Sequence, residues 1–415
     1  DANGNFLLYE MDETGLLKTV TTDKNQSLKM QYNDQNLLKE IELADGTKMQ
    51  YTYDTAGNLT DAAHVSADGT QSVQEPYAYD KEHHMTAITD AEGNDYGVTY
   101  EGEKAVRFTK PDGEYQQITY GDGTTMVSLH KSDGTKISED SMTYEKNSGK
   151  LLSSTNGNGV KTTYQYENAE NPLLQTGTET TVCYQTLENN QVNFKNDVKV
   201  TTTTSYDSNE NVVEEVDETG QVTTTTYGTG KESSLAQTEV IKNSEGETTS
   251  DTTYDYDDHG NTILEYEDIG DSRTEYTYDE DGEVKEEQSY ENVKSEGDAG
   301  VLTSEQTTQK EEADHKVSET LTSTQGEVTQ EDTTSYDAMG REVSSTDQNT
   351  GEVTTITYDF MGRAVKTERS LKDQEGKDIV QTEIKSYNAN GSVTSETSSA
   401  GVTIKYTYDN RNRVT

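Results

Sequence analysis

Three aspartates near the middle of the chain have the residue type and spacing with which a calcium-binding loop begins. Asp255, Asp257 and Asp258 are followed by Gly260. Calcium takes oxygen ligands, and a twelve-residue EF-hand loop ends in a bidentate acidic side chain. Tyr266 stands at that twelfth position. The pattern therefore favours an acidic turn over a dedicated metal site, with weak calcium binding by the acidic surface left open.

Two further groups could do chemistry. His83 and His84 are adjacent and could form a metal pair. Zinc needs three or four ligands, however, and no third His or Cys lies nearby in sequence. Adjacent residues on a strand also point to opposite faces, so a zinc site is not expected here. Cys183 is the only cysteine, so it excludes internal disulfides. No particular histidine can be linked to it as a base, and a half-buried strand position is the better interpretation.

Paired carboxylates for glycoside hydrolysis could be drawn almost anywhere among 80 acidic residues. Their abundance in turns and on polar strand faces is explained by solubility alone. One tyrosine per repeat likewise indicates packing between neighbouring strands rather than a sugar-stacking surface. We therefore predict no enzyme activity, no catalytic, cofactor-binding or metal-binding residues, and no cofactor.

Composition limits the fold and the partners. The net charge is −47, and Leu, Ile, Val and Phe make up only about 15% of the chain, a combination typical of disorder. Against disorder stand 27 Tyr, abundant Thr and only 3 Pro, because Tyr, Thr and Val favour a pleated, half-buried surface. The acidity disfavours nucleic acid and anionic membranes as partners, and no segment is apolar enough to insert into a bilayer.

A ten-residue pattern recurs along the whole chain, as in YTYDTAGNLT from Tyr51 and YTYDEDGEVK from Tyr276. Intervals of mostly 20 to 24 residues indicate a repeat architecture. The repeats align on Tyr9, Tyr32, Tyr53, Tyr79, Tyr100, Tyr120, Tyr144, Tyr166, Tyr184, Tyr206, Tyr227, Tyr256, Tyr278, Tyr336, Tyr358, Tyr387 and Tyr408. A degenerate repeat fits between Tyr278 and Tyr336, with Lys310, Glu311 and Asp314 in place of Tyr, Asp and Gly, which makes 18 units.

Each unit contains two turn signals separated by alternating strand-like segments. The first is Tyr-Asp-x-x-Gly, in which Asp accepts bonds from nearby amides and Gly supplies a positive φ. The second lies half a repeat away, as at Asp45-Gly46 and Asp133-Gly134. Between them, segments such as Val222–Tyr227 alternate with period two. Each unit is therefore predicted to be a β-hairpin.

Two strands per unit give about 36 strands and about 170 Å of sheet at roughly 4.8 Å spacing. Open sheets rarely exceed about 10 strands without curling, so this sheet must coil. Rolled into one ring it would measure roughly 55 Å across, which leaves room for a domain of about 100 residues. A β-propeller is the alternative, but it needs odd and even units that differ systematically, and none is seen.

The pattern resembles the YD repeat of the RHS family, best at Tyr358-Asp359 with Gly362-Arg363 and at Tyr336-Asp337 with Gly340. The resemblance implies an all-β spiral of tandem hairpins, forming part of a shell or cocoon that in toxin members encloses a C-terminal effector. Residues 1–415 would be an interior segment of about 18 repeats, without the cap or the effector. The Pro- and Gly-containing motif of the family's core end is absent, and His83 and Asn412 replace the turn glycine.

The function implied by the resemblance is that of a non-enzymatic shell segment of a large secreted or surface bacterial protein. It would encapsulate or present a C-terminal effector or toxin domain of the same polypeptide. The alternative is an extracellular adhesion module that binds a cell-surface protein or glycan on its outer face. A toxic domain encoded after Thr415 would favour the first, and cell-wall anchors or glycan-binding modules the second.

Overall fold

One antiparallel β-meander accounts for the fold. The computed structural model describes residues 5–188, 191–313, 316–325, 328–372 and 375–415, with the side chains of 182–198 and 311–329 left aside. Within these ranges 33 strands form one sheet, and each strand pairs with the next along the chain, from β1–β2 to β32–β33. The only helical element there is the single turn η1 (Gly230–Glu232).

The strands of the first half are short. They are β1 (Leu7–Met11), β2 (Leu17–Thr22), β3 (Ser27–Tyr32), β4 (Leu38–Glu42), β5 (Lys48–Tyr53), β6 (Leu59–Val65), β7 (Ser72–Tyr79), β8 (Met85–Thr89), β9 (Asp95–Glu101), β10 (Lys104–Thr109), β11 (Tyr115–Tyr120), β12 (Thr124–His130), β13 (Lys136–Tyr144), β14 (Leu151–Thr155) and β15 (Lys161–Gln165).

The second half includes longer hairpins. Its strands are β16 (Gly177–Glu188), β17 (Gln191–Tyr206), β18 (Val212–Val216), β19 (Val222–Tyr227), β20 (Ala236–Lys242), β21 (Thr248–Tyr256), β22 (Thr262–Glu267), β23 (Ser272–Tyr278), β24 (Val284–Glu291), β25 (Val301–Ala313), β26 (Lys316–Gln325), β27 (Val328–Tyr336), β28 (Glu342–Asp347), β29 (Glu352–Tyr358), β30 (Ala364–Lys372), β31 (Asp378–Tyr387), β32 (Val393–Thr397) and β33 (Thr403–Lys405).

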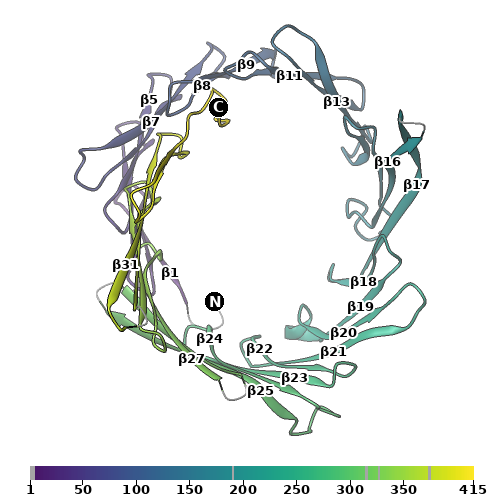
Figure 1. Ribbon diagram of the computed structural model, residues 1–415. Coiled ribbons are helices and arrows are strands. Elements are labelled where there is room, and N and C mark those ends of the chain that lie inside the picture. Colours follow the sequence, from purple (N-terminus) through teal and green to yellow (C-terminus); the bar gives the residue numbers. More distant parts are fainter. Residues whose placement is uncertain (1–4, 189–190, 314–315, 326–327, 373–374) are drawn as a thin grey trace.

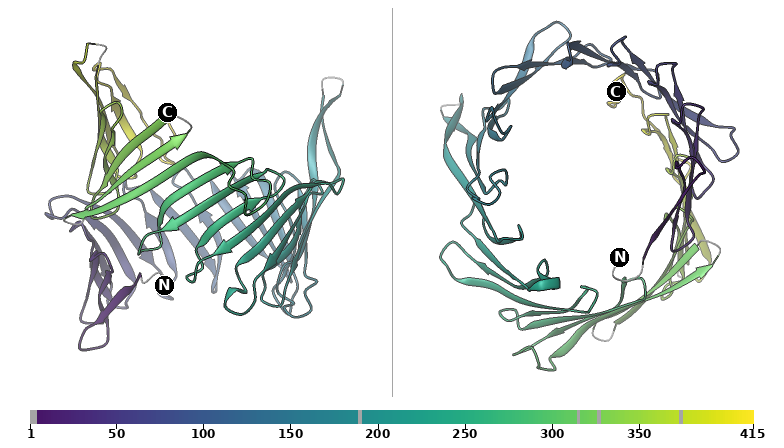
Figure 2. Two further views of the ribbon diagram at one scale, coloured as in Figure 1. Left: turned by 90° about the horizontal axis from the view of Figure 1, so that it is seen from below. Right: turned by 180° about the vertical axis from the view of Figure 1, so that it is seen from behind.

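The sheet is wound into a ring whose two ends overlap. Figure 1 shows the ribbon encircling an open centre, with the last strands beside the first, and Figure 2 shows the two ends stacked along the axis of the ring. Odd-to-even connections such as β5–β6 carry the Tyr-Asp turns and form one rim, which we call the YD rim. Even-to-odd connections such as β4–β5 form the other, which we call the mid-repeat rim.

The circumference of the ring is smaller than the sequence predicted, because the ribbon makes more than one turn. Asp45, between β4 and β5, contacts Arg341, between β27 and β28, so one turn takes the 23 strands from β5 to β27. At about 4.8 Å per strand, one turn holds roughly 110 Å of sheet, not roughly 170 Å. The ring is narrower than predicted because the remaining strands overlap the first ones.

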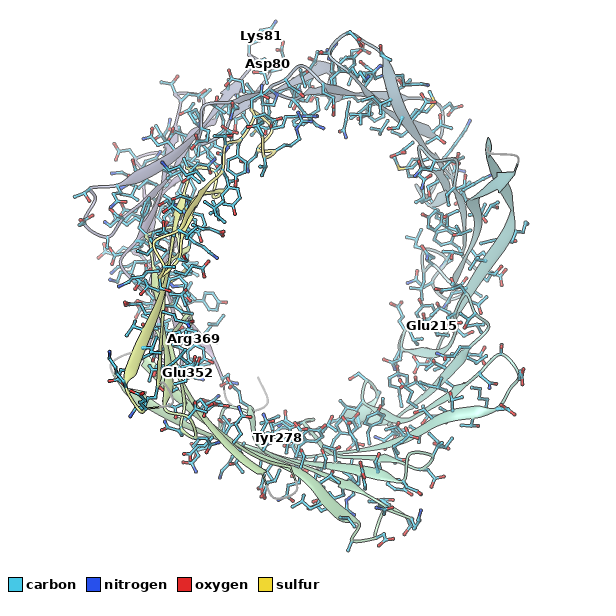
Figure 3. The ribbon with its side chains drawn as sticks, in the orientation of Figure 1. Asp80, Lys81, Glu215, Tyr278, Glu352 and Arg369 are labelled. Atoms are coloured by element: carbon cyan, nitrogen blue, oxygen red, sulfur yellow. The ribbon has the colours of Figure 1, made fainter. Side chains whose placement is uncertain are left out.

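The wall is one sheet thick and has almost no core. Among the described residues the buried apolar side chains are Ala63, Val65, Tyr266 and Val293. Side chains cover both faces of the wall and leave the middle of the ring open (Figure 3). The low apolar content therefore reflects a thin wall rather than disorder. The propeller alternative is wrong, since all strands belong to one continuous meander.

Three details of the repeat alignment need correction. Tyr184 lies inside the hairpin β16–β17, opposite Lys195, and does not precede a turn. Glu311, placed at an Asp turn position, is a strand residue paired with Ser318. Without the Tyr, Asp and Gly signals, strands β25 and β26 of that hairpin stay paired as far as Ala313 and Lys316. The predicted turn residue Asp314 lies outside the described residues. At the chain start, Met11 rather than Tyr9 directly precedes the turn at Asp12.

Candidate functional site

The Tyr-Asp turn is a hydrogen-bonded box built by one carboxylate. In the β5–β6 turn, Oδ1 of Asp54 accepts bonds from the main-chain N–H of Ala56 at 2.8 Å and of Asn58 at 2.9 Å. Gly57 adopts φ +91°, in the region that L side chains rarely occupy. The side chain of Asn58 donates to Asp54, and this bond with the amide bonds lowers the pKa of Asp54. The predicted roles of Asp and Gly are confirmed.

The same box recurs on both rims. It forms at Asp12, Asn33, Asp80, Asp90, Asn156, Asp207, Asp217, Asn243, Asp257, Asp279, Asp337, Asp359 and Asp409. Where the glycine is replaced, the backbone keeps its shape, with φ +69° at His83 and +61° at Asn412. The turn acids are thus occupied in local structure.

The repeated tyrosine bridges the place where neighbouring hairpins separate. The β4–β5 ladder stops at the pair Glu40–Gln50, three residues before Tyr53. The Tyr53 hydroxyl donates to the main-chain carbonyl of Leu38, the first residue of β4, at 2.8 Å. That bond satisfies a carbonyl beyond the end of the ladder and keeps the two hairpins together at the YD rim.

We call this bond the tyrosine latch. It repeats at Tyr32, Tyr53, Tyr120, Tyr166, Tyr206, Tyr227, Tyr256, Tyr278, Tyr358, Tyr387 and Tyr408. The sequence suggested a structural role for the tyrosines through packing. It did not reveal that the hydroxyl carries a main-chain bond.

Side chains join the two overlapping turns of the ribbon along a line we call the seam. The YD rim of the second turn meets the mid-repeat rim of the first. Contacts occur between Lys24 and Asp281 (Nζ–Oδ2 3.1 Å), Asp45 and Arg341 (Oδ2–Nη2 3.4 Å), His64 and Phe360 (ring centroids 5.6 Å), Asp90 and Asn390 (Oδ2–Nδ2 2.9 Å), and Glu114 and Arg411 (Oε2–Nη1 2.6 Å).

The seam combines opposite charges at its best-formed points. Arg411 reaches Asp112 as well as Glu114, and the pKa of Glu114 is lowered by its bond to Lys110 and by Arg411. Burial disfavours the charged ammonium of Lys24, but Asp281 and Glu283 outweigh that effect and raise its pKa. The seam leaves no signal in the sequence, because its partners lie far apart along the chain. The separations are 296 to 300 residues for the contacts of Asp45, Asp90 and Glu114 and for the bond that Glu92 accepts from the N–H of Ala389.

An acidic turn is held from two sides. Lys310, which stands in place of the tyrosine in the degenerate repeat, pairs with Glu283 and approaches Asp279 at 3.6 Å. Lys24 binds the same turn from the other spiral turn. The lysine thus replaces the tyrosine latch with an ionic contact to the preceding YD turn. Figure 3 places Tyr278, which precedes this turn, in the lower wall of the ring.

The two histidines lie in the β7–β8 turn rather than on a strand, so the strand argument used against a metal pair is wrong. Nδ1 of His83 lies 2.7 Å from Oδ1 of Asn58. His84 contacts Glu103 and Asp80 and stacks on Tyr100 at 4.6 Å between ring centroids. Glu103 and then Asp80 raise the pKa of His84. The two rings engage different partners.

The remaining candidates from the sequence are the aspartates around Asp257 and the single cysteine. Asp257 caps its own turn through the N–H groups of His259 and Asn261, and Tyr266 is buried. Cys183 lies in β16, and its side chain is outside the described part. In the ranges that the structure describes, no three His, Cys, Asp or Glu side chains are grouped to hold a metal ion. Nor does any helix there have the length and apolarity to cross a membrane.

These features define a class: a thin-walled shell of tandem β-hairpins wound into an overlapping ring. A family model described as RHS Repeat matches residues 32–71 and 387–415. The search of curated proteins found no match. These two segments thus match the RHS repeat, and the Tyr-Asp turn that they contain recurs along the rest of the chain.

Solved structures share the fold. The Tc holotoxin pore of Photorhabdus luminescens with a mutated TccC3 is 13% identical, with 100% of this chain and 22% of that chain covered and a TM-score of 0.58. The TcdB2–TccC3 complex is 13% identical, with 100% and 23% covered and a TM-score of 0.60. The same complex without its hypervariable C-terminal region is 12% identical, with 100% and 23% covered and a TM-score of 0.58. This chain therefore spans less than a quarter of each of these three chains.

Proposed function

We propose that this chain is a segment of a shell that encloses or presents an effector domain of the same polypeptide. The observation that supports it most is the overlap of the ribbon with itself after 23 strands, as at Asp45 and Arg341. A wall that returns onto its own rim surrounds a space laterally (Figure 3). In this proposal the polypeptide acts outside the producing cell, secreted or at its surface.

The wall itself has a structural rather than a chemical role in this proposal. Its carboxylates cap turns or form seam contacts, as Asp54 and Asp45 do. One of the similar complexes was solved without its hypervariable C-terminal region. By analogy, the enclosed domain of this polypeptide would be a variable one, and the repeats would be its container.

Limited proteolysis of the complete polypeptide, as its organism makes it, tests the proposal. We expect a domain outside residues 1–415 to resist protease while the wall is intact and to become sensitive when urea opens the wall. The matched control is the same domain produced alone, which should be cleaved without urea. Cleavage at the same rate with and without the intact wall would overturn encapsulation, and specific binding of the wall to a cell-surface protein or glycan would support the adhesion module instead.

A further inference from the structure

The hydrogen-bonded ladder of the wall is interrupted within β7. Residues Ser72–Pro76 pair only with β6, and residues Tyr77–Tyr79 pair only with β8. In the described ranges, every other strand with two neighbours has at least one residue that pairs on both sides, as Lys29 does in β3. No ladder therefore crosses β7, where the two halves of the first spiral turn are joined by the covalent chain and by side-chain contacts such as that of His83 with Asn58 at 2.7 Å.

A proline stands at the interruption. Pro76 is the last residue paired with β6, and it has no N–H to donate. Proline in sheets is confined to edges, first residues and irregular positions for this reason. The sequence therefore contributes to the interruption, which is a built feature of this repeat.

The second turn of the spiral lies alongside this interruption, and its own hydrogen-bonded ladder runs without a break from β29 to β32. On the near side, His64 of β6 contacts Phe360 edge-on, with ring centroids 5.6 Å apart. On the far side, Asp90 accepts a bond from Asn390, and Glu92 accepts one from the N–H of Ala389 at 2.6 Å. Between these points β30 and β31 pair over seven residues.

The two kinds of connection differ in strength. The second turn is held internally by consecutive main-chain bonds, whereas the seam consists of side-chain contacts that are partly exposed. Exposed polar and ionic contacts contribute little each and depend on salt. Local opening should therefore begin at the seam and reach β7 next, because no ladder crosses β7.

We propose that β7 is an opening line of the wall, kept closed by the overlap of β29–β32 against β6–β9. In this arrangement the second turn of the spiral holds the two sides of the interruption together through its contacts at Phe360 and Asn390. Release of the seam at Phe360 and Asn390 leaves the contact of His83 with Asn58 as the side-chain link across β7. The β6 and β8 sides can then move apart, and each half of β7 becomes the fraying edge of its own ladder. The inference does not depend on the presence of an enclosed domain.

Hydrogen exchange of the intact chain tests this. The variant combines Phe360→Ala with Asn390→Asp, which places a carboxylate against Asp90. We expect the amides of Val73 and Ala78 to exchange about tenfold faster than in the native chain, while that of Ile118 in β11 stays unchanged. The control is Arg411→Glu, which disrupts the same seam at Asp112 and Glu114 and should leave β7 unchanged.

A cross-link and a urea titration provide second readouts. In a Cys183→Ser background, Asp90→Cys and Asn390→Cys joined by a short bis-maleimide should restore slow exchange at β7 in the Phe360→Ala variant. If the variants do not fold, the native chain in urea below its unfolding transition should show faster exchange at β7 than at β11, because urea weakens the apolar and hydrogen-bonded contacts of the seam. Equal changes in both strands, or none at β7, would overturn the proposal.

Discussion

The hydroxyl of Tyr358 donates a 2.7 Å hydrogen bond to the main-chain carbonyl of Glu342, the residue at which β28 begins. The β28–β29 ladder ends at Ser344–Thr355, so the bond lies beyond the last paired residues. The guanidinium of Arg341 lies over the same ring, 5.0 Å from its centroid. Tyr358 thus closes the hairpin β29–β30 onto the hairpin β27–β28 before it.

Removing a tyrosine latch should destabilise the wall. Tyr53→Phe deletes the donor to Leu38 and leaves that carbonyl without its bond, so we expect the free energy of unfolding to fall by about 0.5 to 1.5 kcal/mol. Tyr51→Phe is the control, because Tyr51 precedes Tyr53 on the same strand face and its hydroxyl bonds no other described residue. Urea unfolding followed by circular dichroism measures both. Equal losses for the two variants would contradict the latch.

The glycine of the YD turn should be needed for its backbone angle rather than for space. At Gly340 φ is +72° and a Cβ would meet nothing within 4 Å. Gly340→Ala should therefore cost about 1 to 2 kcal/mol through backbone strain alone. Gly297 also has room for a Cβ but lacks the positive φ, so Gly297→Ala should change stability by less than about 0.5 kcal/mol. A similar loss of stability in both variants would contradict a requirement for the positive φ.

Turn carboxylates should make stability fall in acid. Hydrogen bonds from Ser66 and Thr70 lower the pKa of Asp68 to about 2, and Arg413 lowers that of Asp409 to about 2. Because both folded pKa values lie below the unfolded value of about 3.9, their contribution is complete above that pH and is lost as pH falls through about 2. In urea melts between about pH 5 and 2, Asp68→Asn should lose less stability than the native chain. A steeper loss in the variant would contradict this sign.

Metal removal should leave the fold unchanged. Asp257 accepts two main-chain N–H bonds at 2.9 Å, and an asparagine can accept the same bonds, as Asn243 does. Asp257→Asn keeps these main-chain bonds but loses the bond that Oδ2 accepts from the Asn261 amide, so it should cost less than about 1 kcal/mol, whereas Asp257→Ala, which loses all three bonds, should cost about 1 to 2 kcal/mol. The thermal midpoint should be the same in EDTA and in calcium. A calcium-dependent midpoint that Asp257→Asn abolishes would show a metal site instead.

The sequence predicts local structure well because each turn carries its own signals. Tyr53, Asp54 and Gly57 specify a hairpin turn wherever they occur, and even His83 adopts the glycine conformation. The prediction fails where the signals are lost, as in the long hairpin β25–β26. The seam could not be predicted, because the contact of Asp45 with Arg341 depends on how many strands complete a turn. That number follows from sheet twist and strand tilt summed over the whole ring.

Small-angle X-ray scattering of the 415-residue chain tests most directly whether the ribbon forms an overlapping ring. A filled globule of this length would have a radius of gyration of about 22 Å and an unfolded chain about 74 Å. We predict a value above the first and far below the second, with a pair-distance distribution of a hollow ring that matches the structure. A filled-sphere profile near 22 Å, or an expanded-chain profile, would contradict the shell.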